Sequence, residues 1–303
     1  MQRWGIIFGS RTRSAQRRWA LMREYMEQQS IAYDMVQSEG EGAMERLARM
    51  LCQNGYQTIV LVGSDGSLND AINGIFTAEK RPKDLALGII PLGIGNDFAA
   101  FWDITPENYR DAIDRIKRRR TKPIDLGVCT ATDAEGNSES RYFLNCVNIG
   151  LGARLIELTN RWQRLISSKR LSLIPIYISH VFERKSFNVA FDTDTEHIAQ
   201  QVMSVCVGNA KGYGQTPNAV PYNSLLDMSV ITRPDWWRLF EGFWLLGKGQ
   251  FLNYRNVHPY RLNRVHFDDI GHASVSLDGR ILPKKNIRQL DIALLPEHLQ
   301  FIF

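Results

Sequence analysis

The strongest indication of the fold comes from residues 58–70, which read TIVLVGSDGSLND. A continuous apolar run such as Ile59 to Val62 is typical of a strand in a parallel sheet that is covered on both faces. Gly63 and Gly66 then permit a tight turn and let a ligand approach the backbone. Apolar residues follow at helical spacing. The stretch therefore predicts a strand, a glycine turn and a helix whose first N–H groups form a site for phosphate.

A second stretch further along the chain repeats this arrangement. Residues 87–99 read LGIIPLGIGNDFA, a β-branched run followed by glycines and Asp97. Open α/β sheets bind ligands at the carboxyl ends of their strands, so we expect Asp65 and Asp97 to lie at one such edge. Both suit Mg²⁺, which prefers carboxylates together with phosphate oxygens and water. Ordinary strand-to-helix turns would explain one such stretch, but two with an Asp at each strand exit favour a ligand site.

The composition is that of a globular protein with a basic surplus. The 303 residues provide for one large or two ordinary domains. The four cysteines show no C-x-x-C spacing, so neither a disulfide framework nor a zinc site is expected. The net charge of +5 fits an anionic partner such as a nucleotide or an acidic membrane surface. No nucleic-acid motif, secretory signal or membrane span is recognised, so we expect a cytoplasmic protein with no nucleic-acid partner.

The pattern of secondary structure changes near Pro123. Before it, strands alternate with helices, which indicates an α/β fold with a parallel, doubly wound sheet. The last helix of this part is expected to open at Thr105-Pro106, an N-cap followed by a proline. After Pro123, strands separated by turns indicate an antiparallel β domain. The strands expected there are 124–130, 141–149, 186–191, 201–208, 226–232, 261–267 and 273–277, a last one runs from 289 to 295, and 154–178 is expected to be helical in part.

Both glycine stretches resemble motifs of the diacylglycerol kinase-like lipid kinases. Residues 62–70 are similar to that family's GGDGTLNE segment, and residues 91–99 to its PLGTGNDFA segment. The first motif is shared with NAD kinases and phosphofructokinases, whereas the second is far more specific. Similarities at residues 141–153, 207–227 and 277–279 extend the resemblance over nearly the whole chain.

The resemblance implies two domains. The first is a nucleotide-binding α/β domain of the NAD kinase/diacylglycerol kinase-like type, formed by residues 1–124 with a returning segment, 286–303. The second is an antiparallel β-sandwich that binds the lipid substrate, formed by residues 125–285. The implied location is the cytoplasm, with peripheral association at the inner membrane face, and a homodimer is left open.

The resemblance also implies an activity, the transfer of the γ-phosphoryl group of ATP to the hydroxyl of a diacylglycerol-like lipid at the membrane surface. This reaction needs held phosphates, Mg²⁺ and a base for the attacking hydroxyl. The nucleotide-binding residues implied are Gly63, Ser64, Asp65, Gly66, Ser67, Asn69, Gly93, Gly95, Asn96 and Asp97. The implied metal ligands are Asp65, Asp97 and Asp227, and Asp65 and Asp278 are assigned to catalysis.

Asp278 is assigned because Arg280 stands where the family has the glutamate that is thought to act as the base. A guanidinium stays protonated in proteins and cannot accept that proton. In an extended segment, Asp278 would share a face with Arg280 because side chains alternate with period two. Asp278 is therefore expected to replace the glutamate, while Arg280 contacts phosphate.

Other positions also depart from the family pattern, and they leave rival functions open. Ser64 replaces a glycine, Ile94 a threonine, and Asn223-Ser224 an Asp-Gly pair. These substitutions favour a catalytically degenerate member that binds nucleotide or lipid in a regulatory role. An NAD kinase is the other rival, and the 91–99 stretch and the segment around Asn209 argue against it.

Two further segments have two interpretations each. The run Lys117 to Arg120 ends a helix, where cations favour the helix dipole, and we prefer this interpretation to phospholipid binding. Residues 236–246 combine Trp, Phe and Leu with Arg238 and with Arg233 just before them. We expect this segment to be a helix packed against the β domain, with contact to a membrane interface as the alternative.

Overall fold

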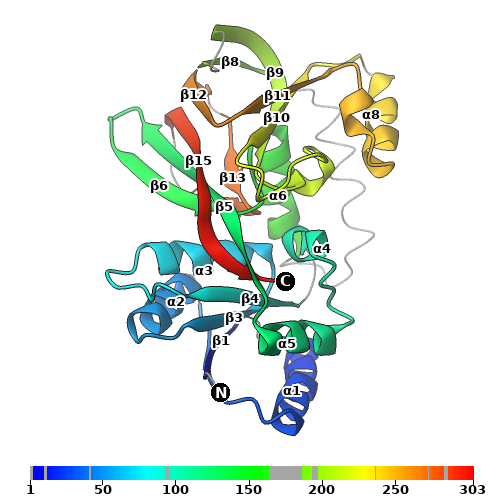
Figure 1. Ribbon diagram of the computed structural model, residues 1–303. Helices are drawn as coiled ribbons and strands as arrows, with labels where there is room; N and C mark the ends of the chain where they lie inside the picture. Colours follow the sequence, from blue (N-terminus) through cyan, green and yellow to red (C-terminus); the bar gives the residue numbers. More distant parts are fainter. Residues whose placement is uncertain are drawn as a thin grey trace. The chain divides into compact units, whose positions relative to one another are not determined.

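The computed structural model describes residues 3–9, 12–40, 42–92, 96–163, 186–192, 197–235, 237–271, 273–282 and 286–303 (Figure 1). The chain divides into two compact units. Unit 1 comprises Met1–Asp125 and Pro296–Phe303, and unit 2 comprises Leu126–Leu295.

Unit 1 is built on a parallel sheet with the strand order β2-β1-β3-β4-β15. Its strands are β1 (Trp4–Phe8), β2 (Tyr33–Gln37), β3 (Thr58–Gly63), β4 (Ala86–Pro91) and the end of β15 (Ile287–Ile302). Its helices are α1 (Arg13–Gln28), α2 (Ala43–Gln53), α3 (Asp65–Phe76), α4 (Asp97–Phe101) and α5 (Tyr109–Arg118). The prediction of a doubly wound parallel sheet is confirmed.

Continuous burial marks the centre of this sheet. Every residue of β3 and β4 is buried, as expected for strands covered on both faces.

Helices α2 and α3 pack closely at Gly74, where an added Cβ would lie 2.1 Å from the backbone oxygen of Glu45. Only a glycine therefore fits this helix crossing.

Helix α5 starts later than predicted. Thr105 was expected to cap it, but the backbone oxygen of Thr105 accepts a hydrogen bond from the N–H of Asn108, at 3.2 Å. The Thr105-Pro106 pair therefore belongs to a turn, and α5 begins at Tyr109.

Unit 2 is an antiparallel β structure. Its strands follow the order β14-β13-β7-β9-β8-β12-β15, β10 pairs with β9 and β11, and β5 pairs with β6. Its strands are β5 (Thr121–Asp133), β6 (Ser138–Phe143), β7 (Cys146–Gly150), β8 (Phe187–Asp192), β9 (His197–Gly208), β10 (Leu226–Thr232), β11 (Val257–Leu262), β12 (Arg264–Asp269), β13 (Val275–Leu277), β14 (Arg280–Ile281) and the start of β15. The described helices are α6 (Leu151–Gln163), η1 (Gly212–Gly214), α8 (Arg238–Gly247) and η2 (Phe251–Asn253). The prediction of an antiparallel second domain is confirmed.

Two strands predicted as continuous are interrupted. The expected strand 141–149 divides into β6 and β7 at Leu144 and Asn145, and the expected strand 261–267 divides into β11 and β12 at Asn263. Conversely, β15 continues through Pro296 instead of ending at Leu295. Of the predicted helix 154–178, α6 covers the described part, and residues 164–178 lie outside the described residues.

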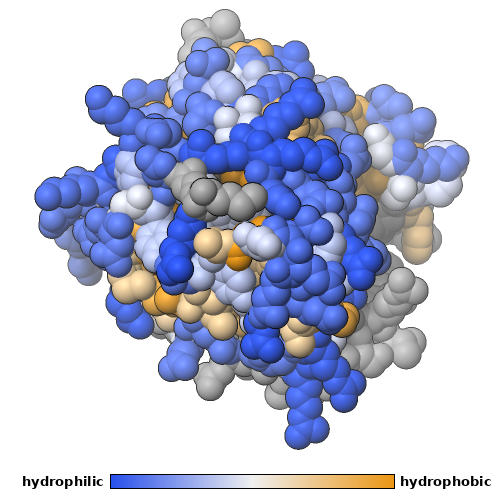
Figure 2. All heavy atoms as spheres, turned by 60° about the horizontal axis from the view of Figure 1, so that its bottom comes forward, coloured by the Kyte–Doolittle hydropathy of each residue, from blue (hydrophilic) through white to orange (hydrophobic). Residues whose placement is uncertain are grey.

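Most large apolar side chains are buried, and α8 is the main exception. Among the side chains that the structure describes, the exposed large hydrophobic ones are Leu21, Met35, Met50, Tyr222, Trp237, Phe240 and Trp244. The interpretation of residues 236–246 as core is therefore wrong for Trp237, Phe240 and Trp244. The face shown in Figure 2 is hydrophilic over most of its area, with small separate hydrophobic areas. In the described ranges, no helix is long and apolar enough to cross a bilayer.

Candidate functional site

The ends of three parallel strands lie side by side in unit 1. Gly63 is the register partner of Pro91, and the N–H of Leu92 donates to the backbone oxygen of Gly63 at 2.8 Å. On the other side, the N–H of Gly9 donates to the oxygen of Val62 at 2.9 Å. Strands β3 and β4 therefore end at the same edge of the sheet.

The Asp65 carboxylate connects the starts of the two helices that follow β3 and β4. Asp65 is the first residue of α3 and is 3% exposed. Its Oδ2 accepts hydrogen bonds from the backbone N–H groups of Asp97, at 2.8 Å, and Phe98, at 3.3 Å. The first N–H groups of a helix have no partner within it and carry a partial positive charge, so the carboxylate stabilises the start of α4. Asp65 thus lies at the N-termini of two helices.

Asp97 occupies the first position of α4 and is exposed. Although much of the residue faces solvent, protein atoms around its carboxyl partly desolvate it and raise its pKa, while a hydrogen bond from its own backbone N–H lowers it. A bound cation would offset this desolvation, so Asp97 fits a role as a ligand of Mg²⁺ through oxygen.

The remaining predicted residues of the first turn differ in accessibility. Ser64 has an extended backbone, with φ −110° and ψ 174°, which any residue adopts, so its replacement of a glycine requires no strain. Ser67 is buried, and its side chain packs against Gly63. A Cβ added at Gly63 would lie 3.0 Å from the Ser67 Cβ. Asn69 is 1% exposed, and its backbone oxygen accepts from Asn73 Nδ2 at 2.8 Å. A contact of Asn69 with nucleotide stays a prediction.

The second turn is described in part. Asn96 is half-buried and directly precedes α4, whereas Gly93, Ile94 and Gly95 lie outside the described residues. Gly66 lies half-buried in the first turn of α3. Nucleotide binding by these residues stays a prediction.

Asp227, the third predicted metal ligand, belongs to β10 in unit 2. Its Oδ1 accepts a hydrogen bond from Arg261 Nε at 2.8 Å, whereas its buried Oδ2 has no hydrogen-bond partner in the described part of the chain. The ion pair already balances the charge of Asp227, so a metal there stays a prediction. The described residues contain one group of three His and Asp side chains close enough to hold a metal ion, Asp192, His197 and Asp268, and all three are exposed.

Asp278 has a different position from the one expected. Leu277 and Arg280 are register partners, and Asp278 and Gly279 between them have φ values of +46° and +84°. Positive φ at both central residues is the requirement of a two-residue type I′ hairpin, for which Asp-Gly is a preferred pair. The expectation that Asp278 and Arg280 share a strand face is therefore wrong.

The Asp278 carboxylate binds the corner between β6 and β7. It is 2% exposed and accepts hydrogen bonds from the N–H groups of Leu144 (2.7 Å), Asn145 (2.9 Å) and Cys146 (2.9 Å). Arg280, in contrast, is exposed. These contacts give Asp278 a structural role and account for the interruption between β6 and β7. Its action as a base stays a prediction.

Two asparagines that the motif comparison did not assign to the site hold the same corner. The Asn145 backbone oxygen accepts from the N–H groups of Asn209 (2.9 Å) and Ala210 (3.0 Å), and its Oδ1 accepts from the N–H of Gly212 (3.0 Å). Asn209 Nδ2 donates to the backbone oxygen of Leu144 at 2.9 Å. Their place in the similar segments 141–153 and 207–227 is the sequence signal for this network.

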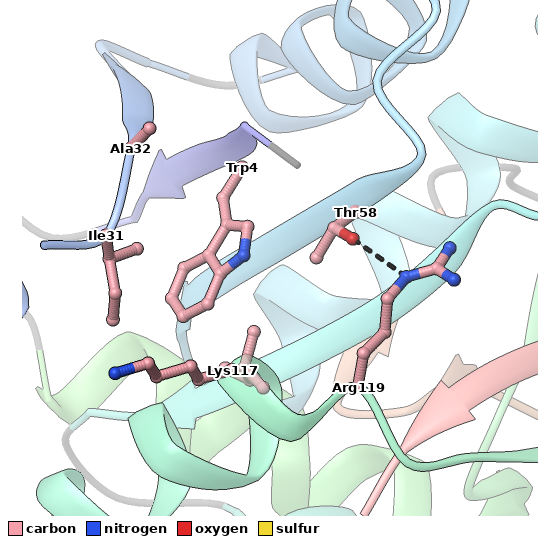
Figure 3. Close-up of a pocket in the computed structure, with 7 residues that line it drawn as sticks. Trp4, Ile31, Ala32, Thr58, Lys117 and Arg119 are labelled. Carbon is pink, nitrogen blue, oxygen red and sulfur yellow. Dashed lines mark hydrogen bonds between the residues drawn. The ribbon is translucent and has the colours of Figure 1, made fainter. Parts of the chain in front are cut away.

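A small pocket of about 60 Å³ lies at the other end of the unit 1 strands, near the first residues of β1 and β3 (Figure 3). Arg119 donates to Thr58 Oγ1 at 3.2 Å, and Lys117 Nζ donates to Gln29 Oε1 at 2.9 Å. Arg119 also donates to the backbone oxygens of Gln57 and Asp84, at 3.2 and 2.5 Å. These contacts agree with our preference for a helix-end role of Lys117 to Arg120.

Comparisons with known proteins agree with both units. The "Diacylglycerol kinase catalytic domain" family matches residues 7–129, and the "YegS C-terminal NAD kinase beta sandwich-like domain" family matches residues 145–303. A diacylglycerol kinase from Staphylococcus haemolyticus is 32% identical over 80% of this chain and 69% of its own length. A Chromohalobacter salexigens protein named "Probable lipid kinase YegS-like" is 26% identical over 97% of this chain and 90% of its own.

Solved structures show the same fold. A diacylglycerol kinase from Bacillus anthracis has a TM-score of 0.71 at 18% identity, with 100% of this chain and 96% of that chain covered. Yeast NADH kinase has a TM-score of 0.56 at 10% identity, with 99% of this chain and 82% of that chain covered.

Proposed function

Because this chain belongs to the diacylglycerol kinase-like family of lipid kinases, we propose that it transfers the γ-phosphoryl group of ATP to the hydroxyl of a diacylglycerol-like lipid. The observation that carries the proposal is the connection that Asp65 makes between the starts of α3 and α4. It brings the N-termini of α3 and α4 to one edge of the sheet. Such an edge, with backbone N–H groups and a carboxylate, favours a nucleotide with its metal ion.

The residues of this edge have distinct parts in the proposed reaction. The first N–H groups of α3 bind phosphate oxygens, and Gly63 and Gly66 let the phosphates approach the backbone. Asp65 holds α4 in place, and the carboxylates of Asp97 and Asp65 would hold Mg²⁺. When bound, this ion neutralises charge on the transferred phosphoryl group. Positioning and electrostatic stabilisation are the main needs of phosphoryl transfer, and this edge supplies both.

The direct test is transfer of radiolabel from ATP to a panel of lipid alcohols, with diacylglycerol, monoacylglycerol and sphingosine in mixed micelles. We expect a labelled lipid that requires Mg²⁺ and is lost in Asp97→Ala. The matched control is Asp103→Asn, at the residue two positions after the end of α4. Labelled lipid from wild type and Asp97→Ala in equal amounts would contradict the assignment of the site.

A regulatory member without catalysis is the second candidate. The observation that favours it is that the Asp278 carboxylate already accepts hydrogen bonds from three backbone N–H groups. Arg280, which stands in place of the family's glutamate, is exposed. Loss of a general base typically costs about 10²–10⁴-fold in rate, so slow turnover would remain if phosphate positioning is intact. Binding of Mg-ATP, measured by calorimetry, without labelled lipid from any substrate would favour this candidate.

Peripheral association with the inner face of the cytoplasmic membrane belongs to the same proposal. The sequence has a surplus of five positive charges, and each basic residue near an anionic lipid surface contributes about 1 kcal/mol. A lipid substrate also requires the enzyme to reach the bilayer surface.

A further inference from the structure

Helix α8 presents three aromatic side chains to solvent. Trp237 is 57% exposed, Phe240 63% and Trp244 58%. Residues three, four and seven positions apart lie on the same side of a helix. Trp237 directly precedes the first residue of α8, so the three rings form a single face, which we call the α8 aromatic face.

The opposite side of α8 is firmly attached to unit 2. Leu245 is buried in a cluster with Phe251 and Tyr254. The Tyr254 hydroxyl donates to the backbone oxygen of Arg238 at 2.9 Å, and a Cβ added at Gly242 would lie 3.0 Å from the Tyr254 ring. The helix therefore already has a packed side, and the α8 aromatic face is a second, outward one.

The chemistry of the face is that of a membrane interface. Trp and Phe combine large apolar rings with a preference for the level of the lipid headgroups. Lys248 Nζ lies 3.8 Å from the centroid of the Trp244 ring, so a cation lies at the end of the face, where a headgroup phosphate would be. Near its other end, the positive charges of Arg233 and Arg238 are matched in number by the negative charges of Asp235 and Glu241. Lys248 therefore supplies the net positive charge of this segment.

The size of the face argues against a protein partner. Three rings that each expose somewhat more than half of their surface present about 400 Å². Each partner in a standard protein interface buries about 800 Å², so two such faces would make a weak contact between copies of the chain. A lipid surface requires no such minimum area, because aromatic rings and basic residues insert individually.

We propose that the α8 aromatic face inserts into the headgroup region of an anionic phospholipid bilayer, with Lys248 at the level of the phosphates. The inference rests on the proposed function, because a kinase of lipids must reach its substrate in a bilayer. It goes beyond that function by assigning the docking element. The element is a short helix of unit 2, while the glycine turns belong to unit 1.

The test is co-sedimentation of the full chain with phosphatidylcholine vesicles with and without phosphatidylglycerol, in the absence of nucleotide. We expect the triple variant Trp237→Ser, Phe240→Ser, Trp244→Ser to bind about tenfold more weakly for each ring removed. We expect Lys248→Gln to bind about fivefold more weakly, on anionic vesicles alone. Leu21→Ser, on α1 of unit 1, removes a side chain with 52% exposure and should bind as wild type does.

Three outcomes would overturn the inference. They are wild-type binding by the triple variant, an equal loss in Leu21→Ser, and a change in oligomeric state of the triple variant with vesicle binding unchanged. Circular dichroism checks that each variant is folded. Phe240→Ser alone, with an expected loss of about tenfold, replaces the triple variant if that one does not fold. The sedimentation assay contains no ATP, so its outcome does not depend on catalysis. A chain that binds vesicles through α8 in this assay but labels no lipid in the separate radiolabel assay would overturn the proposed function and not this inference.

Discussion

The Oδ2 atom of Asp65 lies 2.8 Å from the backbone nitrogen of Asp97, and this hydrogen bond connects the first residues of α3 and α4 in unit 1. Neither residue can move without disturbing the start of the other's helix. The two aspartates that the sequence suggested as equivalent ligands thus have different surroundings. Asp65 is buried and bound to backbone N–H groups, while Asp97 is exposed at the helix start. Their substitutions should therefore have different effects.

Substitution Asp65→Ala should destabilise unit 1 and abolish nucleotide binding. It leaves the N–H groups of Asp97 and Phe98 without their acceptor, and hydrogen bonds to a charged group contribute about 1.5–3 kcal/mol each. We expect the free energy of unfolding to fall by about 3 kcal/mol in urea titrations. Asp84→Asn, at an exposed aspartate of the same unit, serves as the control. Wild-type stability and wild-type affinity for Mg-ATP in Asp65→Ala would contradict this role.

Substitution Asp97→Asn should have the opposite effect on stability. Partial desolvation of its carboxyl group raises the pKa of Asp97 above its usual value of 3.8, so the folded chain binds this proton more readily than the unfolded chain. The corresponding stability is present below the usual pKa and is lost as the pH rises through the raised one. We expect Asp97→Asn to unfold at a higher temperature than wild type at neutral pH. This difference in unfolding temperature should narrow as the pH falls toward 3.8, the usual pKa of an aspartate.

The same Asp97→Asn variant should bind Mg-ATP more weakly, since the removed charge is the one proposed for the cation. Asp103→Asn is the matched control for both measurements. A variant with lower stability than wild type at neutral pH would be evidence against this account of Asp97.

The Asp278 variants separate a structural role from a catalytic one. Asp278→Ala leaves three buried N–H groups without acceptors, so we expect a loss of about 3 kcal/mol or more. Asp278→Asn keeps a residue that tolerates positive φ and one acceptor oxygen, so it should lose less. Turnover by folded Asp278→Asn should stay close to that of wild type if the carboxylate only holds the corner. Arg280→Glu should raise turnover in the same assay, and no gain would show that a glutamate at this position is insufficient.

Gly74→Ala should be among the more damaging small substitutions. The added methyl would overlap the backbone oxygen of Glu45, and α2 and α3 would have to separate, which we expect to cost about 3 kcal/mol. Gly247→Ala is a matched control in a helix, because an added Cβ there meets no atom within 4 Å. It should raise the free energy of unfolding by up to about 1 kcal/mol. Thermal melts of the two variants beside wild type would decide.

Membrane binding should depend on salt through charge and on α8 through apolar contact. We expect vesicle co-sedimentation of wild type to fall as the ionic strength rises, because salt screens the attraction between basic residues and anionic lipid. The triple α8 variant should retain this salt dependence at a lower overall affinity. Binding to neutral and anionic vesicles that is equal at every salt concentration would contradict the electrostatic part.

The sequence predicted the fold well where burial is periodic or continuous. β10 has the predicted bounds, Leu226–Thr232, and β3 extends the predicted run Ile59 to Val62 by one residue at each end. The interruption at Leu144 and Asn145 was missed because its cause, Asp278, is distant in sequence and acts through backbone N–H groups. No local pattern contains that information.

The site was predicted in location more than in detail. The rule that strands of a parallel sheet end at one edge was enough to place Asp65 near Asp97. It did not predict that the Asp65 carboxylate would accept hydrogen bonds from backbone N–H groups. The aromatic residues of α8 were assigned to the core because large apolar side chains are usually buried, a tendency that Trp237 and Phe240 do not follow.

Because of strand β15, the sheet of unit 1 depends on residues that are translated after unit 2. Gln300 and Phe301 pair with Ala86 and Leu87 of β4, and the Phe301 ring lies 5.2 Å from that of Phe98. A nascent chain emerging from the ribosome therefore presents β4 with an open hydrogen-bonding edge while all of unit 2 is being translated. Exposed strand edges invite pairing with other chains. Most of unit 1 is translated first, but its sheet is completed last, so early termination of translation would leave unit 1 prone to aggregation.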